Sequence, residues 1–511
     1  MPPRPSRWPC GSPGRRRRIR EAGTPMGEPQ VLELLSDSEI EAVHDAALAV
    51  LSETGVFIDH PRALEHLAGS GAAVDAASGR VRIPPRLVKE ALAACPSSFV
   101  LYDREGNEAL RLGAREVHFA TASCAVRCQE GTAARPSRAE DLVRLTRVAD
   151  ALPEIDLVST QVVADEAPKE LADSYRLYLV LRNSPKPVVT GAFSEEGLWD
   201  MKALLDAVTG GRTEDRPCAV FDVCPSPPLK WTAISAANIM DAASAGLPVE
   251  FVSMPMPGAA TPVTLAGSVV VHTAETLSGI VLAQTVRPGT RVVWGGAPVG
   301  FDMRHGTAPL SAVEATMIAV AYAQMGRHYG LPTHTYAGLS DSKLLDAQAG
   351  LETALSGTVA ALARIDIIAG AGALDFVGTQ SLEKLVVDAE VCGLIRRLLR
   401  GIEVSPDTLA RDLITALGPG GDYLAQAHTR RWFRTELHLP GPVIDRLDRK
   451  AWEERGRTDI LARARERVEA VLKDDPREPD PDRAAELDRA MRRVMDTRGC
   501  PSLPFVGGAE G

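Results

Sequence analysis

The chain has 511 residues, of which 45% are hydrophobic and 24% are charged, and its net charge is -10 from 57 basic and 67 acidic residues. This size and composition are typical of a large soluble enzyme with one sizeable core and terminal additions. No basic stripe with interleaved aromatics occurs in the core, and no uninterrupted apolar stretch has membrane-spanning length. We therefore expect neither a nucleic acid nor a membrane among its partners.

The N-terminal part is predicted to form two segments. Residues 1–30 combine Pro and Gly with the run Arg15 to Arg18 and lack the apolar core of a secretory signal. We expect a disordered basic tail there, with a nucleic-acid-binding arm as the alternative. Met26 could be the start of translation, in which case residues 1–25 are not made. Residues 31–115 are predicted to form an N-terminal helical subdomain with a small strand pair near 80–83.

Residues 116–401 alternate eight times between a short apolar run and a helical pattern, which predicts an α/β fold. Apolar runs without alternation are typical of strands buried on both faces of a parallel sheet. Eight strand and helix pairs over about 285 residues match a (β/α)8 TIM barrel in number and size. An open, doubly wound sheet is the alternative, because periodicity does not show whether a sheet closes. The strands are expected at 117–121, 155–163, 187–193, 218–224, 249–254, 291–297, 332–337 and 367–371, and the helices at 139–152, 170–181, 195–208, 231–245, 261–286, 312–329, 346–365 and 381–399.

Beyond the barrel, residues 402–496 are predicted to form a charged C-terminal helical segment that caps the barrel or forms an interface. Residues 497–511 are expected to be a flexible tail. The eight cysteines are scattered, which fits a reducing cytoplasm better than a disulfide framework. Cys124 and Cys128 could form half of a metal site, but no second pair with zinc-ligand spacing accompanies them. We therefore expect a cytoplasmic protein without a metal.

Long motifs in the chain resemble those of one known family. The motifs are VSMPMPGAATPVTLAGSVVVHTAETLSGIVLAQ (252–284), GTAPLSAVEA (306–315), YAGLSDSKLLDAQAGLE (336–352), AGAGALDF (369–376), LSDSEIEAVHDAALAVLSETGVFIDHP (35–61) and VEAVLKDD (468–475). By these motifs the chain is identified as a member of the trimethylamine:corrinoid methyltransferase family. The resemblance implies a TIM barrel that transfers a methyl group from a methylated amine to the Co(I) cobalamin of a separate corrinoid protein. It implies no tightly bound cofactor, and it suggests a homo-oligomer.

One position departs from the family pattern. The methanogen enzymes carry pyrrolysine immediately before a Ser-Asp pair at the end of the seventh strand, where this chain has Leu339 before Ser340 and Asp341. Pyrrolysine is thought to bind and orient the amine, which an aliphatic side chain cannot do. Members without pyrrolysine demethylate glycine betaine and related betaines, so the resemblance implies a quaternary amine. Demethylation of a tertiary methylamine and a non-catalytic or sensory methylamine-binding barrel are the alternatives.

An aromatic cage is the expected receptor for a quaternary ammonium, because each ring face contributes about 0.5–2 kcal/mol. Tyr336 is the first candidate, since it lies in the seventh predicted strand three residues before Leu339. Phe301 and Trp294 are the next, and Phe221 and Phe376 also lie at predicted strand ends.

A betaine carboxylate would need hydrogen-bond donors near this cage. Arg304 and His305 follow the sixth predicted strand, and Gln161 lies at the end of the second. His334 is two positions from Tyr336 and therefore shares its face of the strand. No catalytic residue is identified.

Other residues near strand ends have less specific patterns. Asp302, Asp341 and Asp375 could form the carboxylate set of an unrelated lyase or hydrolase. His272 and Glu275 on the long fifth helix are interpreted as structural. Glycines at the ends of the sixth and eighth strands are interpreted as clearing space for the corrin ring, with a phosphate site as the alternative; they are Gly295, Gly296, Gly370 and Gly372.

Overall fold

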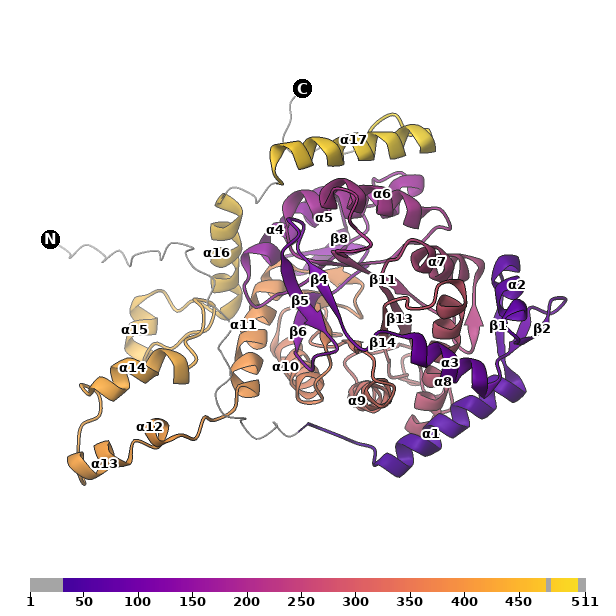
Figure 1. Ribbon diagram of the computed structural model, residues 1–511. Helices are drawn as coiled ribbons and strands as arrows, with labels where there is room; N and C mark the ends of the chain where they lie inside the picture. Colours follow the sequence, from indigo (N-terminus) through magenta and orange to yellow (C-terminus); the bar gives the residue numbers. More distant parts are fainter. Residues whose placement is uncertain (1–30, 475–478, 504–511) are drawn as a thin grey trace.

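A ring of eight parallel strands surrounded by helices forms the centre of the computed structural model (Figure 1). The structure describes residues 31–474 and 479–503, so the predicted basic tail lies outside the described residues. The ring strands are β6 (His118–Thr121), β9 (Val158–Ser159), β10 (Val188–Thr190), β11 (Ala219–Val223), β13 (Val249–Ser253), β14 (Val292–Gly296), β15 (His334–Tyr336) and β16 (Ile367–Ala371). All eight fall within the predicted apolar runs or within a residue of their ends.

The ring is closed. Five strands hydrogen-bond in the order β14-β13-β11-β10-β9, and three more in the order β15-β16-β6. A parallel bridge between Ala120 and Leu157 joins β6 to β9, and a second bridge between Trp294 and Thr333 joins β14 to β15. The fold is therefore a (β/α)8 barrel, and the alternative of an open sheet is wrong.

One helix follows each ring strand and packs outside the barrel. Side-chain caps set several starts: Thr232, Asp346 and Ser381 accept hydrogen bonds from backbone N–H groups in the first turn of their helices. The barrel helices are α4 (Ala139–Ala151), α5 (Ala172–Asn183), α6 (Gly197–Thr209), α7 (Ala233–Ser244), α8 (Leu265–Val286), α9 (Val313–His328), α10 (Ala347–Leu362) and α11 (Leu382–Leu399).

A β-hairpin closes the end of the barrel at which the strands begin. It consists of β4 (Phe99–Tyr102) and β5 (Glu108–Leu112). Its apolar residues, among them Leu101 and Leu112, pack against inward side chains of the ring strands. The Tyr102 N–H donates to the carbonyl of Pro217, two residues before β11. Access to the barrel interior is therefore confined to the opposite end, where the strands end.

The N-terminal segment contains more strand than the helical subdomain that the sequence suggested. Besides α1 (Asp37–Ala49), α2 (Pro61–Gly69) and α3 (Pro85–Ala94), it forms a small sheet. This sheet has the order β12-β1-β3-β2, in which β12 comes from the loop after β11. The strands are β1 (Val56–Ile58), β2 (Ala73–Asp75), β3 (Arg80–Arg82) and β12 (Lys230–Trp231).

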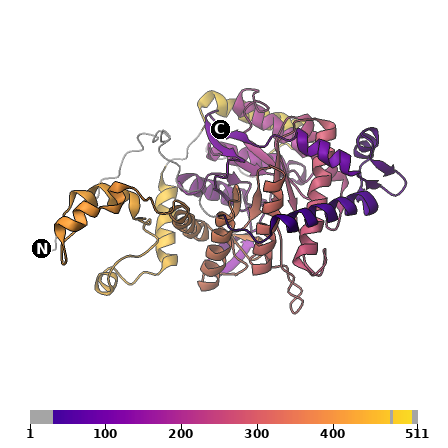
Figure 2. The same ribbon diagram turned by 60° about the horizontal axis from the view of Figure 1, so that its bottom comes forward.

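The C-terminal helices divide into two groups. α16 (Ile460–Lys473) packs on α4 and α11, and α17 (Pro481–Arg498) packs on α5 and α6. Between α11 and α16 the chain forms an arm that extends away from the barrel in both ribbon views (Figures 1 and 2). The arm carries α12 (Pro406–Leu409), α13 (Arg411–Leu417), α14 (Ala427–Glu436) and α15 (Arg449–Glu454).

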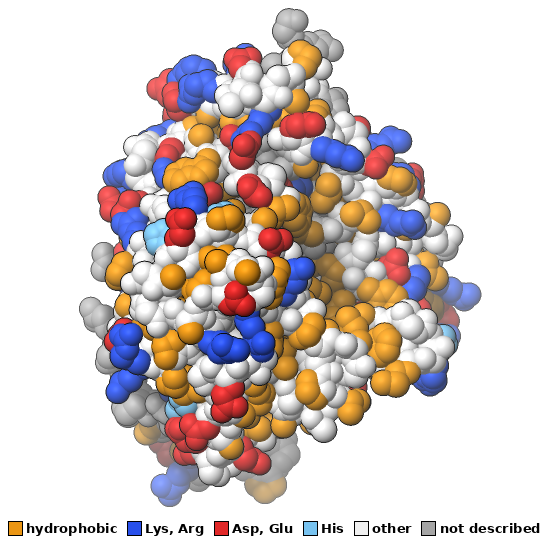
Figure 3. All heavy atoms as spheres, turned by 90° about the vertical axis from the view of Figure 1, so that its right-hand side faces the viewer, with side chains coloured by type: hydrophobic (Ala, Val, Ile, Leu, Met, Phe, Trp, Pro, Cys, Tyr) orange, Lys and Arg blue, Asp and Glu red, His pale blue; other side chains and the backbone are white. Residues whose placement is uncertain are grey.

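One described helix, α8, is long and apolar enough to cross a membrane by length and composition. However, 72% of its apolar window is buried, and it packs between α1, α3, α7, α9 and strand β13. α8 is therefore a core helix of the barrel. On the face that carries α2 and α7 in Figure 1, apolar side chains gather beside a hollow and charged side chains of both signs surround them (Figure 3).

Candidate active site

Two acidic side chains lie on neighbouring strands inside the barrel. Asp222 of β11 is paired in register with Glu250 of β13. Val220, two residues before Asp222, belongs to the inward-facing apolar cluster above the hairpin. Since alternate residues of a strand share a face, Asp222 also points inward, one layer closer to the open end.

Glu250 meets His334 of β15 across the intervening strand β14. Glu250 Oε1 lies 2.5 Å from His334 Nδ1, and both side chains are completely buried. The contact is close but not aligned as a hydrogen bond, and the described residues offer these carboxyl and ring atoms no other hydrogen bond. Gly295 of β14 leaves the space for it, because a Cβ there would lie 3.1 Å from both Glu250 Cγ and His334 Nδ1.

Tyr336 connects this pair to Asp222. Its hydroxyl donates to Asp222 Oδ2 at 3.3 Å and lies 2.5 Å from Ser123 Oγ. Its ring stands edge-on to the His334 ring, with centroids 5.1 Å apart. Side chains of β11, β13 and β15 thus form one polar cluster of Asp222, Glu250, His334 and Tyr336.

The electrostatics of the cluster favour its uncharged forms. Burial raises the pKa of Glu250 well above its ordinary value, and burial together with the nearby Glu250 does the same for Asp222. Burial lowers the pKa of His334 to about 4, although the charge of Asp222 opposes this shift. Burial and Asp222 also raise the pKa of Tyr336. Ionisation of the two carboxyl groups is therefore disfavoured unless a cation lies beside them.

The cluster can be reached from the open end. Asp222 and Tyr336 are partly exposed although both point into the barrel, and Cys224, two residues beyond Asp222, is exposed. Phe193 and Met254, just after β10 and β13, are 54% and 37% exposed. These exposed side chains follow the carboxyl ends of β10, β11 and β13, which is the open end of the barrel.

Leu339 lies beside the cluster but is fully buried. It forms a small apolar group with Ala122 and Ala373, against which Tyr336 and Leu310 pack. Ser340 and Asp341 after it bind within the protein: Ser340 Oγ donates to Glu352 Oε2 at 2.6 Å, and Asp341 accepts the backbone N–H groups of Leu310 and Ser311. In this structure Leu339 is part of the apolar wall behind Tyr336 and has no polar function.

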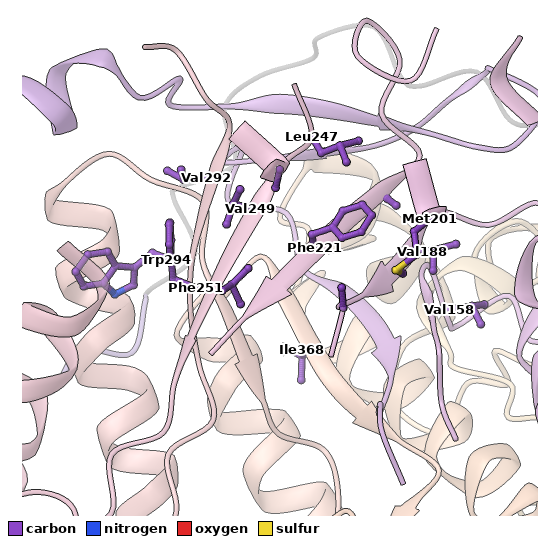
Figure 4. Close-up of a cluster of buried hydrophobic side chains, with 14 of the residues drawn as sticks. Val158, Val188, Met201, Phe221, Leu247, Val249, Phe251, Val292, Trp294 and Ile368 are labelled. Atoms are coloured by element: carbon purple, nitrogen blue, oxygen red, sulfur yellow. The ribbon is translucent and has the colours of Figure 1, made fainter. Parts of the chain in front are cut away.

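The other predicted site residues are dispersed. Gln161 is fully buried, and its side-chain amide has no hydrogen-bond partner among the described residues. Trp294 faces outward, where it contacts His272 and Tyr329, and Figure 4 shows it on the strand layer next to Phe251. The aromatic cage expected from Tyr336, Phe301 and Trp294 is therefore not assembled.

Three predicted residues lie together on the loop after β14. Arg304 is 82% and His305 70% exposed at the side chain, and both contact Asp302. Phe301 and Arg304 line a surface cavity of about 440 Å³ with Met303 and Val263. This rim cavity is outside the polar cluster. Asp302 is bound within the loop, which lowers its pKa through the Arg304 hydrogen bond.

The remaining aromatic candidates have structural contacts. Phe221 is buried in the layer between the barrel strands and the helices (Figure 4). Phe376 lies under the Lys343 ammonium, 3.8 Å from its Nζ.

The interpretation that glycines clear space for a corrin ring is not supported. The space beside Gly295 holds Glu250 and His334, and a Cβ at Gly296 would lie 2.8 Å from the Tyr322 ring. A Cβ at Gly370 would lie 2.1 Å from the carbonyl oxygen of Ala337. These glycines permit close packing within the barrel wall.

The helix residues interpreted as structural do have structural contacts. Glu275 accepts hydrogen bonds from Ser253 Oγ and from the Leu229 N–H, and His272 Nε2 lies 3.0 Å from the Gly295 carbonyl. No group of three or more His, Cys, Asp or Glu suited to a metal occurs in residues 31–474 or 479–503.

Sequence reasoning missed Asp222, Glu250 and the buried Arg176. A signal was present for the first two, because each is an acid inside an otherwise apolar strand, which is costly unless it has a function. Arg176 of α5 was hidden because it sits on a helix. It is paired with Asp173 at 3.0 Å and contacts Thr160 Oγ1 and Cys124 Sγ near the ends of β6 and β9.

Comparison with known proteins shows the same fold and one family. The family model for trimethylamine methyltransferase (MTTB) matches residues 12–499. The trimethylamine methyltransferase MttB of Desulfitobacterium hafniense is 32% identical and the match covers 95% of this chain and 98% of that protein. MttB of Methanosarcina thermophila is 34% identical, covering 86% and 93%.

A glycine betaine methyltransferase of Desulfitobacterium hafniense is 29% identical, covering 86% of this chain and 92% of that protein. Among solved structures, the monomethylamine methyltransferase of Methanosarcina barkeri superposes with a TM-score of 0.53 over 93% of this chain and 90% of that one, at 15% identity, and so shares the fold. The extent of the family match and the identity to MttB proteins show that this chain belongs to the trimethylamine methyltransferase family.

Proposed function

We propose that the protein transfers a methyl group from a quaternary amine, glycine betaine or a related betaine, to the Co(I) cobalamin of a separate corrinoid protein. The cobalt electron pair forms the new Co–C bond. The electrons of the C–N bond leave with the amine, so the products are methyl-Co(III) and a neutral tertiary amine. Neither product requires a proton from the enzyme.

The polar cluster inside the barrel carries this proposal. It places two carboxyl groups, Asp222 and Glu250, next to each other with no Lys or Arg bound to either among the described residues. Ionising either of these adjacent acids without a nearby cation is costly. A ligand with a fixed positive charge would offset this cost, because its charge is not lost by deprotonation.

The ring of Tyr336 adds a second feature suited to an ammonium. Its face can contact the methyl groups while its hydroxyl stays on Asp222. We propose Tyr336, His334 and Gln161 as residues on the substrate side of the barrel. The nitrogen would lie near Asp222, so that one methyl group points toward the open end.

Leu339 supports a quaternary rather than a less methylated amine. It contributes an apolar wall beside Tyr336 and can neither form a covalent adduct nor donate a hydrogen bond. An amine that already carries four carbon substituents needs neither contact.

The corrinoid protein must dock at the open end, because the β4–β5 hairpin closes the other. We propose that it uses the rim that includes Phe301, Arg304 and His305. The exposed apolar side chains Met303 and Val263, each 64% exposed, flank the same cavity and suit a transient protein contact.

We also propose that the chain forms a homo-oligomer and works in the cytoplasm. The arm and the segment that leads into it expose a series of apolar side chains that a second copy would cover. Each is more than half exposed: Ile402, Val404, Leu409, Ile414, Leu424, Leu437 and Leu439. The seven described cysteines are free, as expected in a reducing compartment.

A spectroscopic assay tests the activity. Purified protein is mixed with the reduced corrinoid carrier and a panel of betaines, choline and methylamines, and conversion of Co(I) to methyl-Co(III) is followed. We expect conversion with a quaternary amine. Conversion with trimethylamine alone would favour the tertiary-amine alternative. If an amine binds but no compound of the panel converts the Co(I) of the cognate carrier, a sensory role would be favoured.

A further inference from the structure

A second cavity lies at the closed end of the barrel, away from the polar cluster. It has a volume of about 260 Å³ and is formed by the turn of the β4–β5 hairpin, the loop after α6 and the start of α17. Four arginines line it, Arg104, Arg212, Arg216 and Arg483, against two acids, Glu105 and Asp480. Such a concentration of positive charge is unexpected in a chain with a net charge of -10.

The inner guanidinium groups are held in place by the backbone. Arg104 is only 5% exposed, and its Nη1 donates to the carbonyl of Leu181. Arg216 Nη1 donates to the Gly106 carbonyl at 3.2 Å, and its guanidinium lies over the Tyr102 ring. Two cations are thus fixed on one side of the cavity before any ligand enters.

The other side is completed by α17 and the loop after α6. Arg483 lies against Gly210, where a Cβ would be 2.6 Å from Arg483 Nη1 and would displace this guanidinium. Arg212 is exposed at the rim. The N-terminal turn of the 18-residue helix α17 also lines the cavity at Asp480 and Arg483, with the Asp482 N–H bound to the Asp480 carboxylate at 3.1 Å.

The side chains that line the cavity leave an excess of positive charge. Burial already lowers the pKa of Arg104, and Glu105 only partly offsets this. Glu105 pairs with Arg104 at 3.3 Å, which leaves Asp480 as the one further carboxylate among the described lining residues. It faces Arg212, Arg216 and Arg483, whose planar N–H pairs match the oxygens of a phosphoryl group. The cavity volume suits an ion the size of phosphate or diphosphate.

We propose that this arginine pocket is a binding site for a phosphoryl anion, either an inorganic diphosphate or the phosphate chain of a nucleotide. It is separate from the methyl-transfer site and does not depend on the proposed function. Binding joins the hairpin that closes the barrel to α6 and α17, so we expect the ligand to stabilise the folded protein.

Titration calorimetry and thermal unfolding of the full chain test the site. Phosphate, diphosphate and ATP are the probes, with sulfate at the same concentration and ionic strength as the control anion. We expect diphosphate or ATP to raise Tm and to bind at least about tenfold more tightly than sulfate, as bidentate contacts to several arginines require. Tighter binding of ATP than of diphosphate would identify the nucleotide as the source.

Variants separate this site from general attraction of anions. Arg483→Ala and Arg212→Ala remove guanidinium groups from the open side, and each should weaken diphosphate binding at least about tenfold. Arg489→Ala is the matched control, because Arg489 lies on the same helix and is paired with Glu486 outside the cavity. The proposal is overturned if no probe binds, if sulfate binds as tightly as diphosphate, or if the control variant loses as much affinity as Arg483→Ala. Methyl transfer would be unaffected by any of these results.

Discussion

Replacing Asp222 by Asn should separate cation binding from folding. The substitution keeps the shape of the side chain and an acceptor for the Tyr336 hydroxyl, but it removes the charge. At a separation of about 5 Å and an effective dielectric constant of about 20, a carboxylate and an ammonium attract each other by about 3 kcal/mol. The loss corresponds to a roughly 100-fold weaker Kd.

The effect should depend on pH in a defined direction. Because burial and Glu250 raise the pKa of Asp222, its protonated form is favoured in the free protein, and a bound cation favours release of that proton. Wild-type affinity should therefore rise with pH until Asp222 is ionised in the free protein. The side-chain amide of the Asp222→Asn variant has no such proton to lose, so the difference between the two proteins should grow as pH rises.

Calorimetry with glycine betaine, or with the best substrate of the panel, measures both the Kd and the number of protons released on binding. Titrations in two buffers with different ionisation enthalpies give the number of protons released on binding. We expect wild type to release a fraction of a proton, and Asp222→Asn to release less and bind at least about tenfold more weakly. Equal affinity and equal proton release would refute the assignment of Asp222 as a cation receptor.

Three further substitutions test the packing and charges of the barrel. Gly295→Ala should lower the free energy of unfolding by about 1–3 kcal/mol in chemical denaturation, because its methyl group would clash with Glu250 and the His334 ring. Gly350→Ala is the control, since Gly350 faces open space on α10 and its replacement should be neutral or stabilising. Equal effects of the two substitutions would show that Gly295 is not needed for this packing. Glu250→Gln should raise Tm by an amount that widens as pH rises above the pKa of an unfolded glutamate, because the raised pKa of Glu250 makes the folded wild type lose up to about 1.4 kcal/mol per pH unit there. A difference in Tm that stays constant with pH would show that Glu250 is not protonated in the fold. Lys384→Met removes the ammonium that lies 2.6 Å from the buried Asp388 carboxylate, and it should lower the free energy of unfolding by about 3 kcal/mol or more. Thermal unfolding measures this loss, and a Tm equal to that of wild type would show that the pair does not stabilise the protein.

The barrel could be predicted from the sequence because each of its units leaves a local signal. A strand such as β13 is an apolar run ended by Pro255, and a helix such as α10 starts at a side-chain cap, Asp346. Closure of the ring left no local signal, since it depends on hydrogen bonds between strands that are far apart in the sequence. The bridge between Ala120 and Leu157 is one of them.

The candidate site was predictable only in part. His334 and Tyr336 were found because strand alternation places them on one face. The expectation that Trp294 lines the site was wrong because strand alternation shows which residues share a face but not which face points into the barrel. Glu250 on the neighbouring strand points inward, where it contacts His334 across β14.

The arm and the arginine pocket had no sequence signal of their own. The direction of the arm is set by its contacts with α11, among them the N–H of Gly441 on Glu390 Oε2. The pocket joins Arg104 and Arg483, which are far apart along the chain. Local sequence patterns do not show which distant residues of the chain come into contact.

A crystal structure with glycine betaine, or with the quaternary amine that the assay selects, would show where the ammonium binds. We expect the ammonium inside the barrel, in contact with the Tyr336 ring and next to Asp222, with a methyl group facing the open end. An ammonium bound at the rim cavity beside Arg304, with the polar cluster unchanged and out of contact, would contradict this expectation.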